Sequence, residues 1–172
     1  MKFPLFFILI FIAGCSGKPN NSALPDAQKI SKAQAFLSDL KDSMIFQYNS
    51  NSSNKGKQEI IGKYGQKLQA YLMKNPLDSM RVAIDEVITK GFTVTTKAHF
   101  SSIEFKSTIT FKDSMPPRPD SIYKFMKSLK PGSDVLVNMA YNGDFEINPP
   151  DSEMLSTFKI DAFPFPLQYK SK

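Results

Sequence analysis

Apolar and polar positions change their period near residue 80, which divides the chain into a helical part and a strand part. Before that point apolar residues recur every three or four positions, the spacing of one face of an α-helix. After it they alternate with polar residues over short stretches, the spacing of half-buried β-strands. The pattern predicts an α+β protein in which N-terminal helices precede a small antiparallel β-sheet.

The first helical segment is expected over residues 26–48. Pro25 and Asp26 are typical of a helix start, and the apolar residues that follow recur at three and four. Residues 50–57 are almost entirely polar and rich in Ser and Asn, which predicts a loop.

The second helical segment is expected over residues 58–74 and ends before Pro76. Gly62 and Gly65 weaken this prediction, since each costs about 1 kcal/mol relative to Ala in a helix. A strand over residues 67–73 therefore remains the alternative.

Three strands are expected next, over residues 82–88, 92–100 and 103–111. In the second strand the apolar side chains, including Phe92, occupy even positions, and in the third they occupy odd positions. The phase changes at Ser101-Ser102, which predicts a tight turn or a bulge there.

A rigid break at residues 115–119 (MPPRP) precedes a third helix. Asp120 or Ser121 can cap its start, and Pro131-Gly132 stops it. The helix carries apolar residues between these limits.

Two strand segments follow this helix. Residues 135–141 alternate again, and Asn142-Gly143 then predicts a tight hairpin. Residues 157–163 are expected to form the last strand, which ends at Pro164.

From Met80 onward the expected order is three strands, a helix, and strands again. This order is similar to that of an OB-fold barrel, whose helix lies between the third and fourth strands. The run at residues 128–144 (SLKPGSDVLVNMAYNGD) also resembles the corresponding region of small exported OB-like lipoproteins. The resemblance implies an OB-like barrel with one helix between the third and fourth strands, and it assigns no site residues.

The N-terminus is typical of an export signal. Lys2 is followed by the apolar run Phe3–Ile12, which is about half of the ~20 residues that a membrane-spanning helix needs. The small residues Ala13 and Gly14 suit a signal peptidase. Polar, turn-rich sequence follows.

Residues Ile12-Ala13-Gly14-Cys15 resemble the lipobox of bacterial lipoproteins. The resemblance implies cleavage between Gly14 and Cys15, a diacylglycerol on the Cys15 sulfur, and membrane anchoring by acyl chains. Ser16 follows, and by resemblance to enterobacterial sorting this favours the outer membrane over the inner one. An ordinary signal peptide with a chance cysteine is the alternative. The expected organisation is a signal peptide (1–14), a tether (15–26), a helical region (27–75), an antiparallel β domain (76–166) and a tail (167–172).

Composition removes several classes of site. Cys15 is the only Cys and His99 the only His, so no disulfide can form within the chain and a Cys/His zinc site lacks ligands. We expect no cofactor and no metal.

The net charge of +6 is unevenly distributed. Residues 15–75 hold nine lysines and four acidic residues, whereas residues 76–172 hold twelve basic and twelve acidic residues. A nucleic-acid-binding barrel concentrates cations in its groove, so we do not expect nucleic acid as a partner. The basic segment Lys55–Lys74 could contact anionic lipid headgroups or form a solvated helix face.

Few residues are candidates for chemistry or binding. His99 is a possible general base, although alternation places it on an exposed strand face. Arg118, in a stretch similar to a polyproline ligand, and Phe163 and Phe165 are possible binding residues; the two phenylalanines could instead seal the end of the barrel. The carboxylates that could serve glycoside chemistry are Asp85, Glu86, Glu104, Asp144 and Glu146.

The sequence therefore predicts a lipid-anchored envelope protein that is not an enzyme and that binds or assembles with another envelope component. An inhibitor or immunity lipoprotein that inserts the loop at residues 115–119 into a hydrolase or toxin is one alternative. An OB-like module that binds an oligosaccharide or peptide is a second, and a weak hydrolase that uses the carboxylates is a third.

Overall fold

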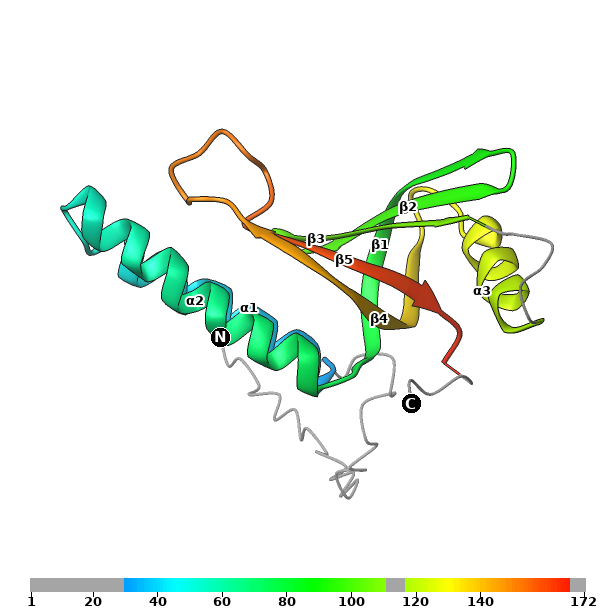
Figure 1. The fold of residues 1–172 in the computed structure, drawn as a ribbon, viewed down its shortest axis with the longest axis horizontal. Helices are drawn as coiled ribbons and strands as arrows, with labels where there is room; N and C mark the ends of the chain where they lie inside the picture. The colour runs from blue at the N-terminus through cyan, green and yellow to red at the C-terminus, as the bar shows by residue number, and fades with distance from the viewer. Residues whose placement is uncertain (1–29, 111–116, 168–172) are drawn as a thin grey trace, which may run out of the picture.

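The computed structural model describes residues 30–110 and 117–167, which form three helices and five strands (Figure 1). The predictions for the signal peptide, for the whole tether and for the tail beyond residue 167 lie outside these residues. Along the chain the elements are α1 (Lys32–Asn49), α2 (Asn54–Lys74), β1 (Leu77–Lys90), β2 (Thr93–Phe100), β3 (Ile103–Thr110), α3 (Pro117–Ser128), β4 (Asp134–Ile147) and β5 (Phe158–Phe165).

The five strands close into a barrel in the order β1-β2-β3-β5-β4. Neighbouring strands run antiparallel except β3 and β5, which pair in parallel. The helix α3 lies between β3 and β4 in the chain. This strand order and helix position are those of an OB-type barrel, so the predicted α+β class with a helix between the third and fourth strands is confirmed.

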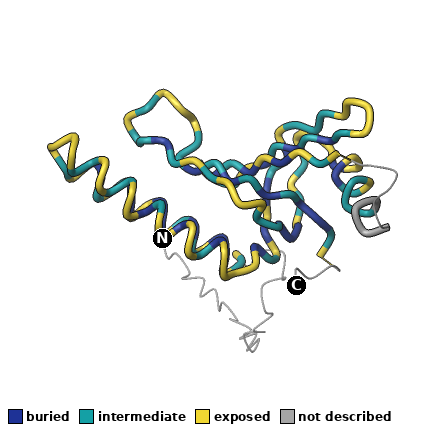
Figure 2. Tube along the Cα trace, in the orientation of Figure 1, coloured by how far each residue is buried: buried dark blue, intermediate teal, exposed yellow. Residues whose placement is uncertain are grey.

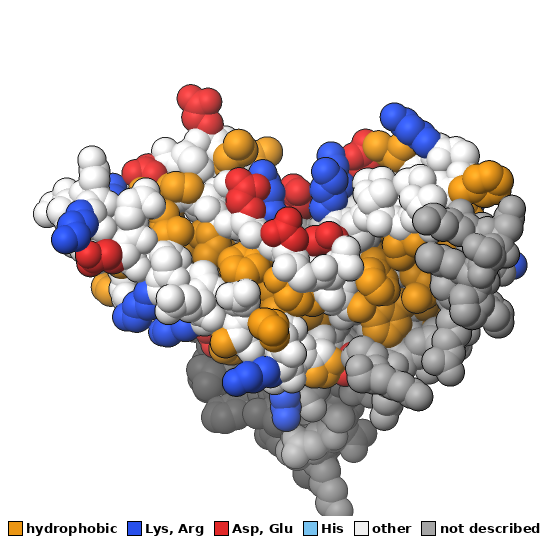
Figure 3. Space-filling view, in the orientation of Figure 1, with side chains coloured by type: hydrophobic (Ala, Val, Ile, Leu, Met, Phe, Trp, Pro, Cys, Tyr) orange, Lys and Arg blue, Asp and Glu red, His pale blue; other side chains and the backbone are white. Residues whose placement is uncertain are grey.

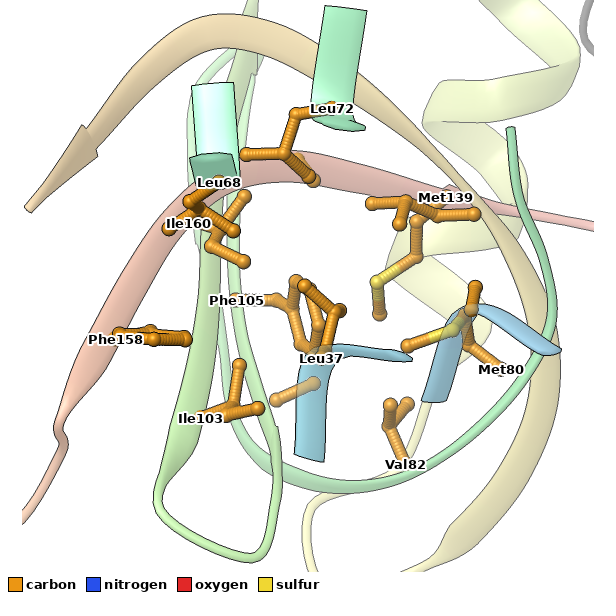
Figure 4. Packing of buried hydrophobic residues seen from close by; sticks show 14 of the residues in the cluster. Leu37, Leu68, Leu72, Met80, Val82, Ile103, Phe105, Met139, Phe158 and Ile160 are labelled. Carbon is orange, nitrogen blue, oxygen red and sulfur yellow. The ribbon is translucent and has the colours of Figure 1, made fainter. Parts of the chain in front are cut away.

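Helices α1 and α2 form an antiparallel hairpin beside the barrel (Figure 1). Leu37 from α1 and Leu68 and Leu72 from α2 point toward barrel residues such as Phe105 and Met80 (Figure 4). All five side chains are almost completely buried. The inner faces of the strands and helices thus share one hydrophobic core, and buried positions alternate with more exposed ones along the strands (Figure 2).

A polar contact also fixes the hairpin to the barrel. The Gln34 side chain accepts a hydrogen bond from the Arg81 backbone N–H at 2.9 Å and donates one to the Arg81 carbonyl at 2.8 Å. Gln34 is 7% exposed, so these bonds satisfy an otherwise costly buried amide.

Both helices of the hairpin start at serine caps that the sequence analysis missed. The Ser31 side chain accepts a hydrogen bond from the Gln34 N–H, so α1 begins at Lys32 and the prediction of helix at Ile30 and Ser31 is wrong. Likewise the Ser53 side chain accepts from Gly56 N–H.

Because of the second cap, α2 begins at Asn54, inside the predicted loop of residues 50–57. The helix continues to Lys74, which confirms a helix over residues 58–74. The alternative of a strand over residues 67–73 is wrong.

The prediction of a tight β-hairpin turn at Asn142-Gly143 is also wrong. Strand β4 runs without interruption from Asp134 to Ile147. Its register with β5 shifts between Tyr141 and Phe145, and Gly143 has φ +99°. Glycine tolerates a positive φ equally in a turn and in a β-bulge. The Asn-Gly pair therefore predicted the unusual backbone conformation correctly, but it could not show which of the two structures forms there.

Proline accounts for two further corrections. Helix α3 begins at Pro117 rather than at a cap on Asp120 or Ser121. Proline suits the first position of a helix because a backbone N–H there would have no acceptor within the helix. Strand β5 continues through Pro164 to Phe165. The pairing of β5 with β3 ends at Asp161. Beyond that residue this edge of β5 has no neighbouring strand, so Pro164 can occupy it without the loss of a hydrogen bond.

The turns between the first strands agree with the prediction in part. Ser101 and Ser102 form a tight turn, with Ser101 at φ 51°. Phe92, which was assigned to the buried face of β2, instead lies in the β1–β2 turn and is 63% exposed.

The bulge gives a stability prediction with an internal control. Gly143→Ala is expected to lower the free energy of unfolding by about 1–3 kcal/mol, since a side chain at positive φ is strained. Gly62→Ala, at an exposed helical site with no neighbouring atom within 4 Å, should raise it by about 1 kcal/mol. Urea unfolding of both variants measures the difference. Equal effects of the two changes would contradict the bulge assignment.

Candidate functional site

A polar cleft of about 680 Å³ runs across the outer surface of β2, β3, β5 and the second half of β4. Acidic and basic side chains gather around a hollow between the β1–β2 turn and the β4–β5 loop, at the top of the view (Figure 3). Its charged lining residues are Lys97, Glu104, Lys106, Asp144, Glu146, Lys159 and Asp161.

The strand register arranges these charges in rows. Glu104 on β3 pairs with Lys159 on β5, which pairs in turn with Glu146 on β4. One step along, Lys106 pairs with Asp161. Directly opposed side chains on one face of a sheet lie close together, so opposite charges alternate in the first row, whereas in the second Lys106 lies between Asp161 and Lys97 of β2.

Two ion pairs stiffen this surface. The Lys159 Nζ lies 3.6 Å from the Glu146 carboxylate, and the Lys97 Nζ lies 2.8 Å from the Glu86 carboxylate. The hydrogen bond and charge of Glu86 raise the pKa of Lys97, which keeps this lysine protonated. Each of the four side chains is between 30% and 60% exposed, so the pairs remain in contact with solvent.

A bulge in β1 directs two consecutive acidic residues toward β2. The register between β1 and β2 shifts between Ile84 and Glu86, which leaves Asp85 as the extra residue. Its carboxylate lies 2.7 Å from His99 Nδ1, while Glu86 contacts Lys97. Consecutive residues of a regular strand would point to opposite faces.

Asp161 contributes the least satisfied group of the cleft. One carboxylate oxygen accepts a hydrogen bond from the Asn142 side chain at 3.0 Å. The other oxygen is buried and has no hydrogen-bond partner among the described residues. That oxygen keeps the energetic cost of an unmet hydrogen bond inside the fold.

Two apolar tips flank the cleft. Phe92 projects from the β1–β2 turn, and Met154 and Leu155, which are 58% and 96% exposed, lie in the β4–β5 loop. Single exposed apolar side chains are ordinary at a protein surface, so the charged floor is the feature that distinguishes this region.

The β4–β5 loop is fixed to the helical hairpin at Asp151. This carboxylate accepts hydrogen bonds from the Tyr48 hydroxyl at 2.8 Å and from Lys57 at 3.2 Å. The Lys57 ammonium also lies over the Tyr48 ring. The Tyr48 hydrogen bond, with Lys57, lowers the pKa of Asp151 below its usual value. The hairpin thus holds the β4–β5 loop, whose Ser156 donates a hydrogen bond to Glu104 of the cleft.

The structure brings together only part of the residues that the sequence singled out. Glu104, Asp144 and Glu146 all line the cleft, whereas Asp85 and Glu86 lie beside it on β1. His99 is on the exposed face, as alternation predicted, and pairs with Asp85.

The possible binding residues lie elsewhere. Phe165 is 4% exposed at the end of β5, and its ring centroid lies 6.4 Å from that of the half-buried Phe163. Neither residue lines the cleft. Arg118 belongs to the first turn of α3, and its side chain lies outside the described part of the structure. The insertion loop expected at residues 115–119 is helical from Pro117 onward.

Sequence reasoning missed the basic half of the cleft, Lys106 and Lys159, together with Asp161. Each occupies an outward position in an alternating strand, and this alternation was the one feature of the sequence that could have indicated them. Only the register between β3 and β5, which are separated in the chain by α3 and β4, places them beside the carboxylates.

Within residues 30–110 and 117–167, no three His, Cys, Asp or Glu side chains lie close enough to hold a metal ion. None of the helices in this part of the chain is long and apolar enough to cross a bilayer.

Comparison with protein-family models, with curated proteins and with solved structures gives no match to this chain.

The Asp151 contacts predict an acid-dependent loss of stability. Because the pKa of Asp151 is lowered in the folded state, its contribution to stability is present above the ordinary value of 3.8 and is lost as the pH falls through the lowered pKa. In Tyr48→Phe the carboxyl loses its main hydrogen-bond donor, so its titration midpoint should rise toward 3.8. NMR titration of the Asp151 carboxyl measures both midpoints. An unchanged midpoint in the variant would mean that the tyrosine does not hold the loop.

Proposed function

We propose that this protein is a lipid-anchored, non-catalytic binding component of the bacterial cell envelope, and that its cleft holds a segment of a protein partner. The anchor is the acylated Cys15, and the outer membrane is the favoured location. The observation that carries the binding role is the charged cleft between the two loops.

The position of the cleft supports an anchored binding role. Residue 30, where the described chain begins, lies at the end of the helical hairpin opposite the β1–β2 turn and the β4–β5 loop (Figure 1). Lipid on Cys15 would therefore hold the body at one end and leave the cleft accessible at the other.

The charges of the cleft favour a peptide segment as the ligand. Three lysines and four carboxylates line it, so the cleft is complementary to a chain that carries both signs of charge. A nucleic acid would meet four repulsive carboxylates. The exposed carboxylate of Asp144 suits a backbone N–H or an ammonium group.

The same geometry supports a role without catalysis. Three of the five candidate carboxylates are held in partly exposed ion pairs: Asp85 with His99, Glu86 with Lys97, and Glu146 with Lys159. Charge pairs on a surface of this kind give orientation and association rate to a complex. An oligosaccharide in the same cleft is the remaining candidate ligand.

Replacement of the anchor residue tests the location. Cys15→Ser should abolish labelling by radioactive palmitate and release the protein from the membrane fraction, because the thioether that carries the acyl chains cannot form. Ser16→Ala, next to it, should leave labelling unchanged. Unlabelled wild-type protein would end the proposal of a lipid anchor.

Charge reversal in the cleft tests the binding role. Lys106 is exposed at the cleft floor, so Lys106→Glu should weaken capture of the partner from detergent-solubilised envelope by about tenfold, a typical effect of one misplaced charge. Lys55→Glu, at the exposed tip of the helical hairpin, is the matched control. Equal capture by both variants and the wild type would exclude the cleft as the binding surface.

A further inference from the structure

Exposed apolar side chains gather at the end of the molecule where the described chain begins. Ile30 precedes α1 and is 70% exposed, Met73 lies in the last turn of α2 and is 71% exposed, and Leu136 on β4 is 43% exposed. Large apolar side chains this accessible usually meet a partner or a membrane when they cluster.

Two of these residues lie together: Ile30 and Leu136, with Tyr71, line one shallow cavity of about 630 Å³, which the ends of both helices and the start of β1 complete. Met73 does not line this cavity; it is exposed beside Lys74 at the same end of α2. Leu167, 43% exposed, adjoins it through Asn138, whose side chain bonds both the Leu167 carbonyl and the N–H of Ser79 in the cavity wall.

Lysines extend this apolar end along α2. Lys63, Lys67 and Lys74 are exposed and are spaced by four and seven residues, which aligns them on one face of the helix. The helix contains five lysines and one glutamate, a net charge of +4. Lysine and arginine side chains line the outer edge of the helical hairpin at the lower side of the view (Figure 3).

Acidic groups on this face are few. Asp78 lines the cavity and is half-buried, and Asp134 is paired with Arg81 at 4.0 Å. The apolar end together with the lysine face of α2, called here the basal face, therefore combines exposed hydrophobic side chains with an excess of positive charge.

We propose that the basal face docks on the surface of an anionic phospholipid bilayer, so that the protein contacts the membrane through its body as well as through its anchor. This inference rests on the proposed lipid anchor. Apolar side chains at the headgroup boundary with lysines around them are the features that hold peripheral proteins on anionic membranes.

The course of the chain supports the membrane as the occupant. The body begins at Ile30 within the basal face, and residues 15–29 at ~3.5 Å each span at most about 50 Å from the proposed acylated sulfur. A short connection gives the basal face a high effective concentration at the bilayer, so even a weak contact is populated. A second copy of the chain would instead bring two lysine faces together.

The absence of tryptophan from the chain allows a direct test. The full-length lipidated protein carrying Met73→Trp is reconstituted into vesicles of phosphatidylglycerol, with brominated lipid as the quencher. We expect blue-shifted emission and quenching. Leu155→Trp, at the 96% exposed tip of the β4–β5 loop, is the matched control and should show neither.

Charge replacement tests the electrostatic part. Lys63→Gln, Lys67→Gln and Lys74→Gln combined with Met73→Trp should reduce the quenched fraction about twofold or more, and added salt should do the same to the parent variant. Vesicles of neutral phosphatidylcholine should give weaker quenching than the anionic ones.

The outcomes separate the two proposals. A protein that floats with vesicles but shows unquenched Met73→Trp emission keeps its anchor and lacks the docking face, which overturns this inference alone. A protein that carries no lipid and does not float with neutral vesicles contradicts the anchor. In that case the Met73→Trp emission on phosphatidylglycerol vesicles at low salt still tests the basal face, because the body would have to bind without acyl chains. Quenched emission would support docking and unquenched emission would overturn it. Quenching at both positions would also overturn the inference.

Discussion

The parallel pairing of β3 with β5 is the constraint on which both the core and the cleft depend. This seam closes the barrel and sets Phe105 beside Ile160 on the inner face. On the outer face the same register sets Glu104 beside Lys159 and Lys106 beside Asp161. Because side chains alternate along a strand, a shift by one residue would bury the charges and expose the phenylalanine. Stability of the core therefore fixes the pattern of charges that a ligand would meet.

Local patterns in the sequence were sufficient for much of the fold. The change from helical to alternating spacing marked the boundary between the hairpin and the barrel, and alternation placed Val94, Ala98 and Phe105 correctly on the inner face, although it misplaced Phe92. The errors arose where one local signal serves two structures. Asn-Gly permits a positive φ in a turn or in a bulge, and proline ends a strand or occupies its free edge. The choice between these depends on which strand lies alongside, and that information is distant in sequence.

The candidate site was predictable to a smaller extent for the same reason. The sequence indicated Glu104 and Glu146 as possible catalytic carboxylates, and both line the cleft. The lysines that neutralise them looked like ordinary solvent-facing positions. Pairs across strands are set by register rather than by spacing along the chain. A pattern of alternation can therefore predict which residues face outward, but only the closed barrel shows which outward residues become neighbours.

The helical hairpin connects the two surfaces that the proposals involve. Its lysine face and the end near Ile30 form the basal face, while Tyr48 and Lys57 hold Asp151 of the loop beside the cleft. The hairpin also shares its buried residues with the barrel, and Gln34 bonds β1 directly. A body joined in this way cannot tilt at the membrane without moving the cleft with it. Contact of the basal face with a bilayer would therefore set the direction in which the cleft points, and an anchored partner would meet it in one orientation.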